Sequence, residues 1–163
     1  MAGDSETAVR EALAQLGVAH ELIHIDPAFA DTDAFCERYG YPREKSGNTI
    51  IVASRREPRV FAACLTTADR KLDVNHKARE LLGVRRLSFA SADDTRELTG
   101  MMIGGVTIFG LPDGLPLYVD AAVMALDYLI IGGGGRSVKV RLAPDELHKI
   151  PGATVVEGLG IAG

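Results

Sequence analysis

Several segments of the chain carry apolar residues at helical spacing between a capping residue and a glycine. The first segment runs from an N-cap at Asp4 or Ser5 to a stop at Gly17. Ser91 and Asp94 have the spacing of a capping box, which predicts the start of another helix. After the first helix, the pattern predicts helices over residues 31–39, 75–82, 91–98 and 144–149.

Runs of β-branched and apolar residues predict the strands. Residues 48–54 and 59–65 are two such runs joined by a short polar loop, which is typical of a β-hairpin. Shorter runs predict strands over 20–25 and 86–89, strands separated by turns over 115–142, and an edge strand near 153–158. Because strands and helices do not alternate regularly, we expect a mixed α/β fold with a central, largely antiparallel, partly closed sheet flanked by helices.

Length and composition fit one globular domain over residues 1–163. Hydrophobic residues make up 47% of the chain and charged residues 25%, which excludes a disordered chain, a collagen-like repeat and a coiled coil. Cys36 and Cys64 stand far apart in apolar surroundings, so we expect two buried thiols in a reducing compartment. The N-terminal segment does not resemble a secretory signal, and no apolar run approaches about 18 residues. We therefore expect a cytoplasmic protein without membrane association.

Charge is distributed unevenly along a chain whose formal net charge is −4. Residues 1–34 contain seven acidic residues and one basic residue, whereas residues 55–86 contain nine basic and four acidic residues. The acidic total argues against a general coat protein for nucleic acids. The middle segment predicts either a solvated face of mixed charge or a basic surface that meets phosphate groups.

The segment HELIH, residues 20–24, matches the H-E-x-x-H pattern of zinc peptidases. That chemistry needs both histidines on one face of a helix, one turn apart. A glycine upstream and Pro27 downstream leave too few residues for such a helix, and in a strand the two histidines stand about 13 Å apart. We predict ordinary strand histidines and no metal. A small zinc hydrolase that uses His20, Glu21 and His24 is kept as a further hypothesis beside those stated below.

The glycine-rich segment GGGGRS, residues 132–137, does not fit a nucleotide-binding loop. A Walker loop needs Lys before Ser or Thr, and Arg136 takes that place. A dinucleotide-binding loop opens a helix, whereas a β-branched run follows here. Two interpretations remain: a glycine turn between two strands, or a loop whose bare amides lie close to a ligand together with Arg136.

The segment TGMMIGGVTIFGLP, residues 99–112, places paired glycines between apolar residues. Such a chain turns sharply and leaves main-chain N–H groups unshielded, so it can hold a small polar group or an oxyanion without side chains. A tight bend within a sheet is an equally good interpretation of the same pattern.

Five segments in this order resemble the YbaK/prolyl-tRNA editing-domain family of aminoacyl-tRNA deacylases. They are NTIIVAS (48–54), ADRKLDVN (68–75), GGVTIFGLP (104–112), LYVDAAV (117–123) and IGGGGRS (131–137). The resemblance extends from about His20 to Leu147. It implies a compact α/β fold whose central mixed sheet partly closes on itself. It also implies hydrolysis of the ester between a wrong amino acid and tRNA, commonly a mischarged prolyl-tRNA, by a free-standing protein acting in trans.

The same resemblance assigns roles to individual residues. The first glycine loop would surround the aminoacyl group and the terminal adenosine. Its residues are Gly104, Gly105, Val106 and Thr107. Asp120 follows the strand after that loop. The second glycine segment would border the pocket through Gly134, Arg136 and Ser137. The basic stretch 55–86 would meet the phosphates of the acceptor stem.

Two positions depart from the pattern of the family. The family usually has Lys at the start of the first core strand, where this chain has Asn48, and Lys45 lies three residues earlier. The glycine loop normally carries Pro after Thr, where this chain has Ile108. We keep Lys45 and Ile108 as candidate substrate-binding residues. A neutral amide in place of an ammonium group costs roughly 1–3 kcal/mol, or about 10- to 100-fold in rate.

The leading hypothesis is an aminoacyl-tRNA deacylase that uses the main-chain amides of residues 104–107 and an ordered water, with Asn48 positioning the substrate or the water. We expect no cofactor and no metal. The alternative is a non-catalytic relative that binds tRNA, an aminoacyl group or a synthetase. The sequence is compatible with a monomer and with a homodimer. The leading hypothesis depends on convergence of Asn48 and the two glycine segments on one cavity.

Overall fold

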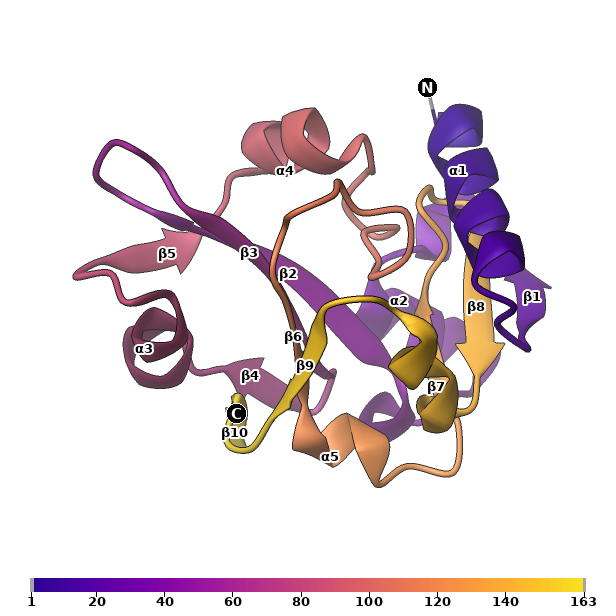
Figure 1. The fold of residues 1–163 in the computed structure, drawn as a ribbon. Helices are drawn as coiled ribbons and strands as arrows, with labels where there is room; N and C mark the ends of the chain where they lie inside the picture. Colours follow the sequence, from indigo (N-terminus) through magenta and orange to yellow (C-terminus); the bar gives the residue numbers. More distant parts are fainter. Residues whose placement is uncertain (1, 163) are drawn as a thin grey trace.

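The computed structural model describes residues 2–162, whose strands form sheets of five, three and two strands (Figure 1). The five-stranded sheet, in spatial order, consists of β5 (Leu87–Phe89), β2 (Gly47–Ser54), β3 (Phe61–Thr67), β6 (Leu117–Asp120) and β9 (Ala153–Val156). The smaller sheets consist of β1 (Glu21–His24), β8 (Val138–Leu142) and β7 (Leu129–Gly132), and of β10 (Gly160–Ala162) with β4 (Arg70–Leu72). Only the pairs β3–β6 and β6–β9 are parallel, so the fold is of the predicted mixed, largely antiparallel class.

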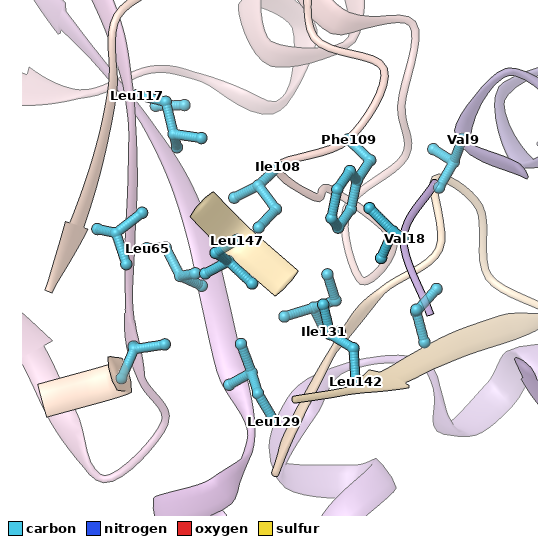
Figure 2. Packing of buried hydrophobic residues seen from close by; sticks show 14 of the residues in the cluster. Val9, Val18, Leu65, Ile108, Phe109, Leu117, Leu129, Ile131, Leu142 and Leu147 are labelled. Carbon is cyan, nitrogen blue, oxygen red and sulfur yellow. The ribbon is translucent and has the colours of Figure 1, made fainter. Parts of the chain in front are cut away.

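The two larger sheets are joined at one end and share a core. Ser46, immediately before β2, forms a parallel bridge with Ile130 of β7. Within residues 2–162 the strands do not close into a barrel. Figure 2 shows Leu65 of β3, Leu129 and Ile131 of β7 and Leu142 of β8 pointing into one apolar cluster. Burial of this cluster fixes the position of the two sheets relative to each other. It therefore also fixes the positions of the loops at the ends of the sheets.

Helices flank the sheets. They are α1 (Ala2–Gln15), α2 (Thr32–Tyr39), α3 (Arg79–Leu82), α4 (Ala92–Thr99) and α5 (Ala121–Met124). Shorter helical turns cover Pro27–Phe29, Arg43–Lys45, Val74–Ala78 and Pro144–Lys149. In Figure 1, α1 lies beside β1 and β8, and α4 lies on the side of the β2–β3 hairpin.

Local signals placed several of these elements correctly. Gly40 closes α2 with a left-handed φ of 77°, and the Ser91 hydroxyl accepts a hydrogen bond of 3.0 Å from the amide of Asp94 at the start of α4. The hairpin of β2 and β3 is confirmed, and β9 forms an edge of its sheet as predicted. Cys36 and Cys64 are both buried, as expected.

Other predictions were wrong in detail. The first helix begins at Ala2, so neither Asp4 nor Ser5 is its N-cap. Ser5, Glu6 and Val9 of this helix pack on the loop 133–136, so Ser5 lies inside the helix rather than at its start: a Cβ on Gly134 would lie 2.6 Å from the carbonyl oxygen of Ser5. The predicted helix over 75–82 is confirmed as a helical segment that ends at Gly83, but its first part, Val74–Ala78, is a π-helical turn and only the short α3 is α-helical.

Three short elements were not predicted. They are β4, β10 and α5, each of three or four residues. Elements of this length are held by pairing and capping partners distant in sequence rather than by their own periodicity. The carboxylate of Asp120, for example, accepts hydrogen bonds from the hydroxyl of Thr66 and from the amide of Gly160.

Candidate functional site

A pocket of about 390 Å³ opens along β2, between the start of α2 and the loop that follows α4. Its lining residues are Asp31, Thr32, Asp33, Gly47, Asn48, Thr49, Ile50, Ile51, Ala90, Thr95, Ile103, Gly104, Val106, Gly132 and Lys139. Asn48 and parts of both glycine segments therefore lie around one cavity. Its walls combine main-chain groups, a carboxamide and a buried ammonium group.

Asn48 is held in one orientation by α2. The hydroxyl of Thr32 donates a hydrogen bond of 2.5 Å to Oδ1 of Asn48. Among residues 2–162, Nδ2 of Asn48 has no hydrogen-bond partner, so this donor is available to a ligand. A fixed carboxamide whose NH₂ group is unused is suited to position a water molecule or a carbonyl group.

The first glycine loop has two kinds of amide group. The N–H of Gly105 donates to the carbonyl of Met102 at 2.8 Å, and the N–H of Thr107 lies 3.4 Å from the sulfur of Met101. The N–H groups of Gly104 and Val106 have no partner within the described chain, and both residues line the pocket. The amides of Gly104 and Val106 are thus the better candidates for contact with an oxyanion.

Glycine is required where the two glycine segments touch. Gly104 has a φ of +90°, and a Cβ on Gly105 would lie 2.1 Å from the carbonyl oxygen of Gly135. The amide of Gly134 donates a 2.6 Å hydrogen bond to the carbonyl of Gly105. The interpretation of these segments as tight turns is confirmed, and the turns bring bare main chain to the pocket. Contact of that main chain with a ligand stays a prediction.

The second glycine segment faces α1 over part of its length. The hydroxyl of Ser137 donates to the carboxylate of Glu6, at 2.6 and 2.7 Å, and its amide donates to the same group at 2.9 Å. Gly134 packs on Ser5 of the same helix. In this segment Gly132 lines the pocket, whereas Gly134 and Ser137 lie outside its lining. Their role in substrate binding stays a prediction.

Arg136 joins three segments beside the pocket. Its guanidinium group donates to the carbonyls of Ile103 at 2.7 Å and Pro27 at 3.2 Å, and pairs with the carboxylate of Asp31 at 3.1 Å. These contacts hold the glycine loop against the segment before α2. The side chain lines a neighbouring cavity with Met101 and Ile103 rather than the pocket itself.

Lys139 of β8 is the buried cation of the pocket. Its side chain is 4% exposed, and Nζ donates to the carbonyls of Ala30 at 2.6 Å and Gly104 at 2.8 Å. Burial lowers the pKa of Lys139 from 10.5 to about 8, an effect that the nearby charge of Asp31 opposes and that of Arg136 reinforces. The ammonium group also lies 5.5 Å from the centre of the Phe35 ring. Lys139 therefore anchors the loop at Gly104.

The remaining candidates lie outside the lining of the pocket. Lys45 pairs with Asp127 at 2.8 Å, which raises the pKa of Lys45 and lowers that of Asp127. Asp120 is 2% exposed and caps α5 through the amide of Ala122. Ile108 is 2% exposed in the main apolar cluster (Figure 2), so it does not fill the pocket.

His24 lies in a strand as predicted, and His20 directly precedes that strand. β1 pairs antiparallel with β8, and Nδ1 of His20 lies 2.8 Å from the carbonyl of Val18. In the part of the chain that the structure describes, no group of three His, Cys, Asp or Glu side chains is placed to hold a metal ion. Nor does any helix there have the length and apolar character needed to cross a membrane.

Comparison with known families gives a match over most of the chain. Residues 26–150 match the family model of the aminoacyl-tRNA editing domain. The chain belongs to the aminoacyl-tRNA editing domain family. The five segments that resemble this family lie within or close to the matched range.

Individual relatives resemble the chain over most of its length. The editing domain is 24% identical over 141 residues to the uncharacterized protein YwhH of Bacillus subtilis, covering 86% of this chain and 87% of YwhH. It superposes on the crystal structure of the hypothetical protein APE2540 with a TM-score of 0.84 and 25% identity, covering 94% and 99% of the two chains. A proposed trans-editing enzyme for prolyl-tRNA synthetase gives a TM-score of 0.80 and 25% identity, with coverage of 94% and 95%.

Sequence reasoning missed Lys139 as a pocket residue of this editing domain. In the run SVKVRL, a Lys between two Val residues suggests a solvent-facing position on a half-buried strand. β8 is the central strand of its sheet, and the segment that contains Ala30 and Phe35 covers that position. Only this long-range covering distinguishes Lys139 from an ordinary surface lysine.

Proposed function

We propose that this editing domain hydrolyses the ester bond of a mischarged aminoacyl-tRNA in trans, and that its substrate is of the prolyl-tRNA type. Membership of the editing-domain family and the similarity to a proposed trans-editing enzyme for prolyl-tRNA synthetase support the reaction class. The observation that carries the proposal is the single pocket lined by Asn48, Gly104, Val106 and Lys139. No other described cavity combines unused main-chain donors with a fixed carboxamide.

The proposed reaction is a hydrolysis. The oxygen of a water molecule bonds to the ester carbonyl carbon, and negative charge develops on the carbonyl oxygen. The bond from that carbon to the ribose oxygen then breaks, and the ribose oxygen takes up one proton while the attacking water loses one. The products are a free amino acid and an uncharged tRNA.

The pocket offers donors for the developing oxyanion and a group that positions the water or the substrate. The amides of Gly104 and Val106 are fixed donors for the oxyanion, and fixed donors stabilise it without reorganisation during the reaction. Nδ2 of Asn48 positions the water or the substrate, because Thr32 fixes the carboxamide through Oδ1. Lys139 keeps Gly104 in place by its bond to the carbonyl of that residue and adds positive potential to the pocket.

The test is release of amino acid from a full panel of aminoacyl-tRNAs by the purified protein. Asn48→Ala should lower kcat/KM about 10-fold, since it removes one donor to the reacting groups. Asn75→Ala makes the same chemical change at an exposed position outside the pocket, and should leave kcat/KM unchanged.

Two outcomes would contradict the proposal. Absence of turnover above background on every member of the panel would reject the enzyme. Saturable tRNA binding without hydrolysis, unchanged in Asn48→Lys, would identify a non-catalytic member that binds tRNA or a synthetase. The neutral Asn48 is the feature that favours this second function.

A further inference from the structure

A second cavity of about 450 Å³ lies at the far end of β2 from Asn48. Arg56 comes from the β2–β3 loop, while Arg85 and Arg86 come from the segment just before β5. Glu57 is the only acidic residue of its lining. Three guanidinium groups against one carboxylate make this cavity positive in a protein whose formal net charge is −4.

The three guanidinium groups are not used within the protein. Arg56, Arg85 and Arg86 are exposed, and none of them makes a side-chain hydrogen bond or ion pair within residues 2–162. Arg59 of the same hairpin differs, because it pairs with Asp94 at 3.1 Å. Clustered guanidinium groups without partners are suited to bind phosphate, which they hold with paired hydrogen bonds.

An exposed aromatic side chain lies between this cavity and the proposed active site. Phe89 is 59% exposed, the highest value among the described large hydrophobic residues. It belongs to β5 (Figure 1). This strand begins directly after Arg86 of the cavity and ends directly before Ala90 of the pocket. Exposed aromatic rings beside basic groups are typical of surfaces that stack the bases of single-stranded nucleic acid.

The spacing along β5 fits a short single strand. At about 3.3 Å per residue, Arg86 and Ala90 stand about 13 Å apart. In a stacked helical strand, phosphates follow one another at ~3.4 Å along the helix axis, so this distance corresponds to at most about four nucleotides. The pocket, the ring and the arginine cavity therefore follow one another at intervals that nucleotides can bridge.

We propose that the unpaired 3′ end of the tRNA runs from the pocket along β5, with a base stacked on Phe89 and a backbone phosphate held by Arg56, Arg85 and Arg86. This proposal rests on the proposed function and adds to it the path of the RNA. It also confines the predicted phosphate contact of the basic stretch 55–86 to the arginines of one cavity. Arg70 and Lys71 belong to the same stretch but lie on β4, in the two-stranded sheet.

The experiment compares two substrates that differ in length. The full aminoacyl-tRNA uses the whole path, whereas an aminoacyl-adenosine ester occupies the pocket alone. In the double variant Arg85→Gln/Arg86→Gln, kcat/KM should fall at least 10-fold on the aminoacyl-tRNA and less than 2-fold on the short ester. Phe89→Ala should lower kcat/KM about 10-fold on the aminoacyl-tRNA only. The control Arg70→Gln/Lys71→Gln removes the same charge and should change neither value more than 2-fold.

Binding of uncharged tRNA, measured by fluorescence anisotropy against salt, separates this proposal from the proposed function. The Arg85→Gln/Arg86→Gln variant should bind more weakly, with a salt slope smaller by up to about 0.7, the value for one phosphate contact on a single strand. If the wild type hydrolyses neither substrate, this slope still tests the RNA path. Equal losses in the control pair would show a dependence on total charge and overturn the proposal. Equal losses on both substrates, or no loss of tRNA binding, would overturn it as well.

Discussion

Replacing Lys139 with Met tests how far a buried ammonium group organises the pocket. Met keeps an unbranched side chain beside the Phe35 ring but donates no hydrogen bond. The carbonyls of Ala30 and Gly104 then lose donors that lie at 2.6 and 2.8 Å in the wild type. The change therefore removes the anchor of the glycine loop without altering any other residue of the pocket.

Two effects on stability oppose each other. A buried carbonyl without a donor costs roughly 1–3 kcal/mol, so the two carbonyls together cost about 2–6 kcal/mol. In the wild type, burial lowers the pKa of Lys139 from 10.5 to about 8. A shift of that size corresponds to about 3 kcal/mol of unfavourable charge burial at neutral pH, and Met relieves it. The free energy of unfolding should therefore fall by at most about 3 kcal/mol, and a small gain is also within this range.

The effect on activity should be a loss, whereas the effect on stability can have either sign. Loss of a hydrogen bond to a charged group is worth about 1.5–3 kcal/mol, so kcat/KM on aminoacyl-tRNA should fall about 10- to 150-fold. The assay is ester hydrolysis alongside urea unfolding at the same pH. Lys149→Met is the matched control, because Nζ of Lys149 also donates to a main-chain carbonyl, that of Gly17 at 2.8 Å, but outside the pocket. A folded Lys139→Met protein whose kcat/KM stays within twofold of wild type would refute the reasoning.

The same residue predicts a pH dependence of stability. The unfolded chain keeps the proton of Lys139 up to its ordinary pKa of 10.5, whereas the folded protein releases it at about 8. The unfolded state thus holds more protons above pH 8, and the free energy of unfolding should rise with pH, by at most about 1.4 kcal/mol per pH unit. The window is pH 8–9, because burial raises the pKa of the Cys64 thiol from 9.0 to about 12 and so lowers stability at higher pH. Urea unfolding of Lys139→Met over this window should show no such rise.

Three further predictions concern residues outside this contact. Gly105→Ala should lower the free energy of unfolding by at least 3 kcal/mol, since its Cβ would lie 2.1 Å from the Gly135 carbonyl oxygen. The control Gly100→Ala lies at a left-handed φ with open space and should lower it by only about 1 kcal/mol. Equal shifts of the melting temperature in the two variants would contradict this prediction. The Cys64 thiol should resist alkylation at pH 8 until the protein unfolds, because its raised pKa keeps it protonated; labelling of the native protein detected by mass spectrometry would argue against this. Asp120→Ala should lower the free energy of unfolding by about 2–4 kcal/mol, because three donors lose their acceptor, and unchanged urea unfolding would exclude this structural role.

The sequence by itself determined the elements that local chemistry controls. Gly40 ends α2 because it adopts a left-handed conformation at little cost, and Ser91 starts α4 because its hydroxyl accepts from an amide three residues ahead. The two β-branched runs on either side of residues 55–58 specify the hairpin through their own pattern. The order of five short segments was enough to indicate the editing-domain family.

The tertiary structure decided which groups of the site are free and which are used. Whether the amide of Gly104 or that of Gly105 is available depends on where Met102 lies, and no pattern of glycines contains that information. Arg136 reaches Asp31 across 105 positions of sequence. Lys139 became a pocket residue only because a segment more than 100 positions away folds over β8 and offers it the carbonyl of Ala30. Local sequence sets conformation through short-range contacts, whereas burial and pairing of polar groups depend on neighbours that only the folded chain brings together.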